Sequence, residues 1–145
     1  MKKYVTLDHV LKHATNNQKH MAVLEHRPKK YMFGTLNYGE IKGWYNKSDG
    51  DCWDVFVPGM KRHLPLNTPM KIKKILGVLF LENGNHKIAI QVYHADYDVN
   101  AAKEEITRYS QKYTGKMHKL GCWMDLETIN NTGMNTRELC NAIFQ

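Results

Sequence analysis

Three carboxylates near the middle of the sequence are the side chains best suited to chemistry. Asp49, Asp51 and Asp54 fall within six residues of the segment KSDGDCWDVFVPG, which spans Lys47–Gly59. Ionised carboxylates this close together repel one another, and a divalent cation such as Mg²⁺, which prefers oxygen ligands, relieves that repulsion. Along an extended chain the first two acids point the same way and the third points the other way. The three can therefore converge only if the chain turns near Cys52.

Two interpretations of this acidic segment stay open on the residues alone. Gly50 lets the backbone bend between the first two acids, so the segment could be a solvated turn that leads into a strand. A metal site is favoured by the third acid and by its place at the start of the hydrophobic run Val55–Val57. The sequence therefore predicts a candidate cation site, with an exposed turn as the alternative.

The elements that must position these acids are strands in the middle of the chain, with helices at its two ends. Helices are predicted from a Thr6 cap to about Asn16, from Asp98 or Asn100 to about Tyr113, and over Thr136–Phe144 behind an Asn135–Glu138 capping box. Strands or short extended pieces are predicted at Met21–Leu24, Tyr31–Gly34, Gly39–Tyr45, Cys52–Val57, Lys71–Leu81, His86–Tyr93 and Lys116–Trp123.

This order of elements predicts an α+β fold. The turn at Glu82–Asn85 makes a hairpin of the strands on either side of it, and Lys61–Thr68 is a predicted loop. The 145 residues suit one domain with one core, covering residues 1–145. We expect a small closed or highly curved β-barrel with helices packed outside it.

Composition limits the class of protein and its surroundings. The longest apolar run, Ile75–Leu81, has the length of a strand, so we expect no membrane span. The N-terminus lacks the apolar segment of a secretory signal, which makes the cytoplasm the default expectation. The three cysteines are odd in number and far apart, so we expect free thiols rather than disulfides or a zinc site.

A net charge of +7 predicts an anionic partner. Nucleic acid, a phosphorylated small molecule and an acidic protein all fit this charge, which alone does not choose among them. The tryptophans, Trp44, Trp53 and Trp123, are most simply packing residues.

The order and spacing of several motifs resemble the soluble inorganic pyrophosphatase family. The resemblance runs from about Lys19 to Trp123, and the DGDxxDV pattern at Asp49–Val55 is its specific part. It is supported by the segments Asn37–Ile41, Leu76–Leu79, Gly84–Lys87, Ile88–Ile90 and Tyr109–Trp123. The family implies a five-stranded, OB-like barrel, a homo-oligomer, and Mg²⁺-dependent hydrolysis of pyrophosphate to two phosphates, with Mn²⁺ as the alternative cation.

The resemblance also implies roles for individual residues. Asp49 and Asp54 resemble metal ligands, with Asp54 bridging two ions, and Glu82 resembles a further acid of the metal site. Asp51 resembles the catalytic carboxylate that orients and deprotonates the attacking water. The residues that would bind substrate are Lys19, Arg27, Tyr38, Lys87, Tyr109 and Lys112.

Some positions depart from the family pattern. Asn85 stands at or beside the place of a family aspartate, and Ser110 stands where the family has a lysine, so Lys112 is the candidate substitute. These departures keep an alternative open, in which a catalytically weakened pyrophosphatase-like scaffold binds a nucleotide, a nucleic acid or a protein. A basic nucleic-acid-binding barrel unrelated to the family is a third hypothesis.

Overall fold

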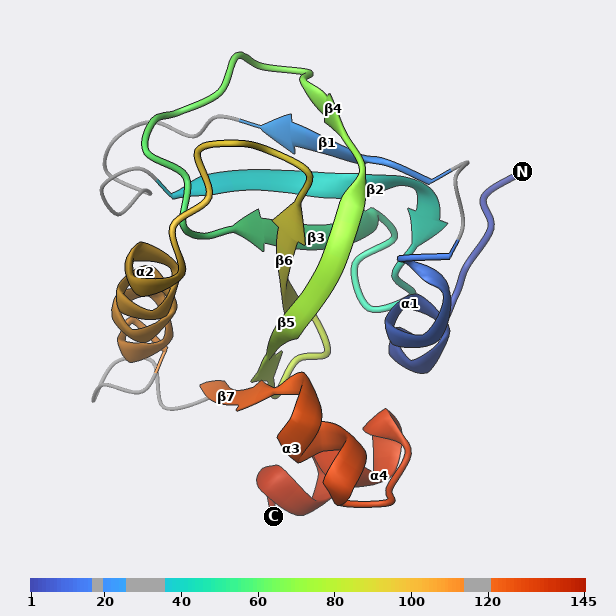
Figure 1. The fold of residues 1–145 in the computed structure, drawn as a ribbon. Coiled ribbons are helices and arrows are strands. Elements are labelled where there is room, and N and C mark those ends of the chain that lie inside the picture. Colours follow the sequence, from blue (N-terminus) through green and yellow to red (C-terminus); the bar gives the residue numbers. More distant parts are fainter. Residues whose placement is uncertain (17–19, 26–35, 114–120) are drawn as a thin grey trace.

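The computed structural model describes residues 1–16, 20–25, 36–113 and 121–145. These residues form an α+β fold, in which one seven-stranded mixed sheet is accompanied by four helices (Figure 1). The α+β prediction is confirmed. The predicted piece Tyr31–Gly34, most of the predicted strand before Trp123, and the candidate ligands Lys19 and Arg27 lie outside the described residues.

The strands and helices follow the order expected from the hydrophobic pattern, with three additions. The strands are β1 Ala22–Glu25, β2 Asn37–Tyr45, β3 Cys52–Val57, β4 Pro69–Met70, β5 Ile72–Leu81, β6 Lys87–Val92 and β7 Gly121–Asp125. The helices are α1 Leu7–His13, α2 Val99–Gln111, α3 Leu126–Asn131 and α4 Thr136–Ile143. The short β4, the end of β7 and the helix α3 are the parts that the pattern did not predict.

The strands pair in the order β4-β1-β2-β3-β6-β5-β7, and every pairing is antiparallel except β3 with β6. Only Lys71 separates β4 from β5, so one extended stretch pairs first with β1 and then with β6. The sheet must therefore curve strongly. The described pairings form an open series of seven strands, so the predicted closed barrel of five strands is not confirmed.

The central strands bury side chains on both faces of the sheet. Val55 and Val57 of β3 belong to the main core, together with residues of α1 and α3. Phe56, between them, points to the opposite face, where it packs with Leu79, Ala89 and Tyr109. Alternation along a strand sends successive side chains to opposite faces. The second face of β3, β5 and β6 is therefore the one that α2 covers.

Helix capping follows the sequence signals closely. The side chains of Thr6 and Asp98 accept hydrogen bonds from the backbone N–H of His9 and Ala101. Asn135 and Glu138 form the predicted capping box of α4. The unpredicted α3 follows β7 directly and is capped by the last residue of that strand, Asp125. No loop separates β7 from α3, so the sequence carries no turn residues that would have marked where the helix begins.

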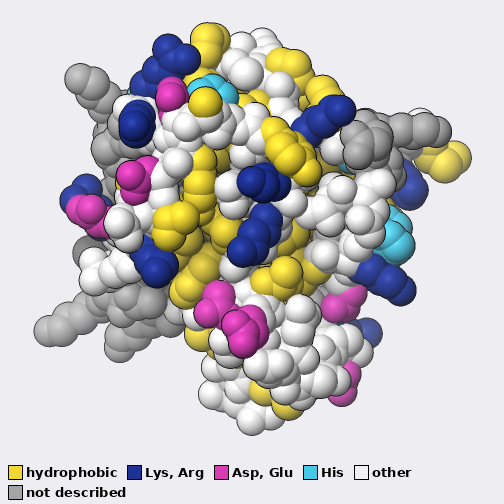
Figure 2. Space-filling model, viewed as in Figure 1, with side chains coloured by type: hydrophobic (Ala, Val, Ile, Leu, Met, Phe, Trp, Pro, Cys, Tyr) yellow, Lys and Arg dark blue, Asp and Glu magenta, His cyan; other side chains and the backbone are white. Residues whose placement is uncertain are grey.

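The remaining expectations from composition concern thiols, membranes and surface charge. Cys52, Cys122 and Cys140 are free, with the first buried and the others half-buried. No helix among the described residues has the length and apolar character that crossing a bilayer requires. Figure 2 shows lysine and arginine side chains spread over one face of the molecule rather than gathered in a single patch.

Candidate functional site

An ion pair between two neighbouring strands forms the centre of the candidate site. Lys87 Nζ donates a hydrogen bond to Asp54 Oδ2 at 2.7 Å. Their side chains are 15% and 24% exposed, so the pair is partly shielded from water. The parallel pairing of Val55 with Ile88 places the two residues side by side on β3 and β6. Water screens the attraction between these two charges less than it screens a surface pair, because the surrounding dielectric is lower.

Asp49 joins this pair through the side-chain amide of Asn85. With its nitrogen turned toward the acids, the amide donates to Asp49 Oδ2 and to Asp54 Oδ2 at 3.1 Å each. The opposite orientation would set the amide oxygen against two carboxylates. The structure therefore brings two of the three predicted acids together. Asn85, which departs from the pyrophosphatase sequence pattern, lies between them.

Two turns hold Asp49 in this position. Asn46 is buried, its side chain donates to the carbonyl of Gly84 at 3.1 Å, and it accepts from the N–H of Ser48 at 3.0 Å. Gly50 has a φ of 76°, in the left-handed region that glycine adopts most readily. The chain therefore reverses at Gly50, slightly earlier than the turn near Cys52 that the sequence predicted.

The other two predicted acids do not line this site. The side chain of Asp51 is exposed, and its backbone N–H donates to Asp49 Oδ1 at 3.0 Å, which fixes the turn. Glu82 is also exposed and lies near α4. Burial first, and the Glu82 carboxylate second, raise the pKa of the Cys140 thiol. Neither carboxylate is part of the Asp49–Asp54–Asn85 cluster.

A cavity of about 240 Å³ opens beside the ion pair. It is smaller than the roughly 300–1,000 Å³ typical of drug-sized ligand sites, so it suits a small ligand. Five residues that the resemblance selected meet at this cavity from three strands and α2. The lining is Tyr38, Gly39, Asp54, Lys87, Tyr109, Lys112 and Tyr113.

Three tyrosines form the wall of the cavity on the α2 side. The rings of Tyr38 and Tyr109 meet edge to face with their centroids 5.4 Å apart. The hydroxyl oxygens of Tyr109 and Tyr113 are 3.5 Å apart. Burial, followed by the neighbouring tyrosines, raises the pKa of Tyr109 far above its ordinary value, so its hydroxyl stays protonated. A protonated phenol can donate a hydrogen bond to an anion.

Sequence reasoning missed two neighbours of the site. Tyr113 lies one helical turn beyond Tyr109, and this spacing is a signal that could have found it. His86 precedes Lys87 and is buried, and its Nδ1 accepts the N–H of Leu81 at 2.9 Å. Burial first, and Lys87 second, lower the pKa of His86 to about 4, so its imidazole is neutral near pH 7.

The side chains of the cluster carry oxygen atoms of the kind that a hard cation binds. Two carboxylates with an amide between them supply the oxygen ligands that Mg²⁺ prefers, once the Asn85 amide turns its oxygen inward. Mg²⁺ often uses only one or two carboxylates and completes its shell with water and phosphate oxygens. Within the described part of the chain, no three His, Cys, Asp or Glu side chains gather closely enough to hold a metal ion.

Comparison with known proteins adds no assignment. No family model, curated protein or solved structure matches this chain.

Proposed function

We propose that the protein hydrolyses inorganic pyrophosphate to two phosphates in a reaction that depends on Mg²⁺, with Mn²⁺ as a substitute. The observation that carries the proposal is the meeting of one acid, two lysines and three phenols at one small cavity. Asp54 and Lys87 form its centre, and Tyr38, Tyr109 and Lys112 surround them. A phosphate ligand needs cationic groups and hydrogen-bond donors, and these line the cavity. A cation needs carboxylates, and Asp54 lies in the lining with Asp49 beside it.

In this proposal each residue has a simple task. Asp49, Asp54 and Asn85 would hold the cation through their side-chain oxygens. When bound, the cation would lower the pKa of a water molecule and neutralise phosphate oxygens. Lys87 and Lys112 would balance the charge of the phosphates, and the hydroxyl of Tyr109 would donate to a phosphate oxygen. Asp51 as the base that takes the proton of the attacking water rests on the sequence resemblance alone.

The same proposal extends to the architecture and assembly. β4 and β5 can be counted as one continuous strand, which pairs with β1 at one end and with β6 at the other. Counted in this way, that strand and β1, β2, β3 and β6 would form a barrel of five strands. We include this barrel, and the homo-oligomer that the resemblance implies, in the proposal. Sedimentation of the purified chain tests the assembly.

Phosphate release from pyrophosphate tests the function. The wild-type chain should release phosphate when Mg²⁺ or Mn²⁺ is present and should stop when the cation is chelated. Asp49→Asn and Asp54→Asn should each lower the rate at least about a hundredfold, because each removes the negative charge of a proposed cation ligand with little change in volume. Asp96→Asn, which changes the same side chain away from the cavity, should keep the rate.

The rate of Asp51→Asn tests the base separately. A rate like that of the wild type removes Asp51 from the mechanism and leaves the cation site intact. A wild-type chain that releases no phosphate at any Mg²⁺ or Mn²⁺ concentration overturns the whole proposal.

One observation favours the alternative of a binding module. The Asp54 carboxylate is already neutralised by Lys87 and hydrogen-bonded by Asn85, and neither Asp51 nor Glu82 lines the cavity. A module of this kind would bind pyrophosphate or a nucleotide equally well with and without Mg²⁺. Calorimetric titration of both ligands, before and after Asp49, Asp51 and Asp54 are all changed to Asn, separates the two functions.

A further inference from the structure

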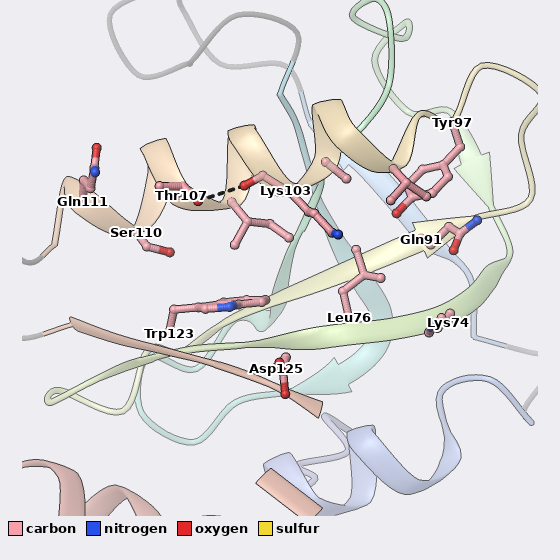
Figure 3. Close-up of a pocket in the computed structure, with 13 residues that line it drawn as sticks. Lys74, Leu76, Gln91, Tyr97, Lys103, Thr107, Ser110, Gln111, Trp123 and Asp125 are labelled. Carbon is pink, nitrogen blue, oxygen red and sulfur yellow. Dashed lines mark hydrogen bonds between the residues drawn. The ribbon is translucent and has the colours of Figure 1, made fainter. Parts of the chain in front are cut away.

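A second and larger cavity lies on the other side of α2, away from the acidic cluster. Its volume is about 760 Å³, which is within the range typical of sites for organic small molecules. Figure 3 shows α2 along one wall, with residues of β5, β6 and β7 opposite. The cavity shares no lining residue with the smaller one.

The floor of this cavity is a flat aromatic surface. The indole of Trp123 lies against Gly77 of β5, where a Cβ atom would come within 2.6 Å of the ring. The missing side chain of Gly77 therefore lets the indole lie directly on the strand. Leu76 and Ile106 add aliphatic surface to the lining. A flat, apolar ligand would find a matching surface here.

A hydroxyl group without a partner faces the same space. Ser110 is 9% exposed, and its Oγ forms no hydrogen bond with any residue that the structure describes. In Figure 3 the hydroxyl projects from α2 on the side of Trp123. A buried hydroxyl without a partner costs free energy, roughly 1–3 kcal/mol, and a ligand that supplies a partner recovers it.

Two lysines give the cavity a positive end. Lys74 and Lys103 line it, and neither forms an ion pair with a described residue. Figure 3 shows the side chain of Lys103 reaching from α2 toward Leu76 and Gln91. The carboxylate of Asp125 also lines the cavity, but its Oδ1 accepts the N–H of Thr128 as the cap of α3. The anionic part of a ligand therefore belongs at the lysines.

We propose that this cavity binds a small organic anion with a flat aromatic body, which lies on Trp123 and directs its charge toward Lys74 and Lys103. The ligand would also form a hydrogen bond with the Ser110 hydroxyl, as donor or as acceptor. This site is independent of pyrophosphate hydrolysis, because its lining is separate from the acidic cluster.

A pair of fluorescent probes tests the proposal directly. Anilinonaphthalene sulfonate combines a fused aromatic body with one negative charge, and N-phenylnaphthylamine has nearly the same body without the charge. Both should bind the folded chain and gain fluorescence, with transfer of excitation from Trp123. The charged probe should bind about tenfold more tightly than the neutral one, since only the charged probe gains from the lysines.

Matched variants locate the binding. The double change Lys74→Gln and Lys103→Gln should remove the advantage of the charged probe and leave the neutral probe unaffected. Lys73→Gln is the control, because it removes the same charge from the neighbouring residue, which lies over the ring of Tyr93 instead. Ser110→Leu should block both probes, because the larger apolar side chain fills the cavity and removes the unpaired hydroxyl.

The outcomes are distinct. The proposal is overturned if neither probe binds, if Ser110→Leu binds both as the wild type does while keeping its circular dichroism, or if the lysine variant keeps the charged probe's advantage. If Ser110→Leu fails to fold, the lysine variant and the indole N–H resonance of Trp123, which should shift when probe is added, decide instead. Pyrophosphate hydrolysis should be the same in the Lys74 and Lys103 variants as in the wild type.

Discussion

His86 shows how the burial of one residue can make the stability of the whole chain depend on pH. Its Nδ1 accepts a backbone hydrogen bond, and its ring meets Phe80 edge to face at 5.2 Å. The folded state lowers the pKa of His86 from 6.5 to about 4, so the unfolded chain binds a proton more readily. Stability from this group is therefore complete above about pH 6.5 and is lost as the pH falls toward 4.

We expect the free energy of unfolding to fall on this account by at most about 3 kcal/mol between pH 7 and pH 4. Urea unfolding at several pH values measures the loss. The comparison is His86→Asn, whose amide oxygen can accept the same N–H and which does not titrate. The variant should lose markedly less stability over this range. An equal loss in both proteins would show that other groups cause it.

The ion pair of Lys87 with Asp54 yields a second prediction for a single residue. Lys87→Gln removes the charge that neutralises Asp54, so the chain should lose about 1–3 kcal/mol of stability. The same change should strengthen Mg²⁺ binding, because the carboxylate becomes free to hold a cation. Thermal unfolding with and without Mg²⁺ measures both effects. Lys42→Gln, which removes an exposed partner of Glu40, should show neither effect.

The sequence predicted a good part of the candidate site at the level of residues. Asp49 and Asp54 converge, and Tyr38, Lys87, Tyr109 and Lys112 line one cavity beside them. The sequence did not predict which acids lie outside the candidate site. Asp51 and Glu82 lie in turns, where the direction of a side chain depends on hydrogen bonds such as that of Asn46 with Gly84. Contacts of that kind join segments far apart in the sequence, so local patterns do not reveal them.

At the scale of elements, the close packing of β5 and β7 depends on one glycine. A Cβ atom at Gly77 would lie 2.5 Å from the carbonyl oxygen of Met124 and 2.6 Å from the Trp123 ring. Gly77→Ala should therefore force the two strands apart and cost about 1–3 kcal/mol. Gly133→Ala is the comparison, since its φ of 68° strains the backbone but nothing lies within 4 Å of the new atom.

Urea unfolding of both glycine variants provides the measurement. The Gly77 variant should also change the near-ultraviolet circular dichroism of Trp123, whereas the Gly133 variant should not. Equal stability of the Gly77 variant and the wild type would mean that β7 can shift away from β5 at no cost.

The sequence predicted most individual elements and little of how they pair. Cys52–Val57 was predicted to the residue, and the caps of α1 and α4 were named correctly, because periodicity and capping are local signals. The cap of α2, Asp98, was one of two candidates. The parallel pairing of β3 with β6 depends on contacts between residues distant in the sequence. The same is true of the change of partner from β1 to β6 along the stretch of β4 and β5. The closed barrel of five strands stays a prediction, because closure depends on which strands pair and not on how many strands the sequence contains.

For the whole molecule, the first and last helices are tied together by one carboxylate. Asp8 of α1 accepts hydrogen bonds from the N–H of Thr136 at 3.1 and 3.2 Å and from its hydroxyl at 2.9 Å. These bonds join residues 128 positions apart and place a negative charge at the start of α4. They hold the C-terminal segment against the N-terminal one.

Asp8→Ala should lower the free energy of unfolding by about 1–3 kcal/mol, because two buried donors of Thr136 lose their acceptor. Limited proteolysis should then cut within α4 before it cuts the sheet. Asp8→Asn keeps one acceptor oxygen and should give a smaller loss. Glu127→Gln, which removes the charge of an exposed acid in α3, is the control for charge alone. If it lowers the free energy of unfolding as much as Asp8→Ala does, the hydrogen bonds between Asp8 and Thr136 are not the cause.

The parallel pairing of β3 with β6 has a consequence for how the molecule folds. Asp54 and Lys87 are 33 residues apart, and β6 reaches β3 only after the chain between them has formed β5 and turned back. Closing so long a loop is an entropic cost that the chain meets late in refolding. The pyrophosphate hydrolysis that we propose for this site should therefore return later than the helical signal when the denatured chain refolds.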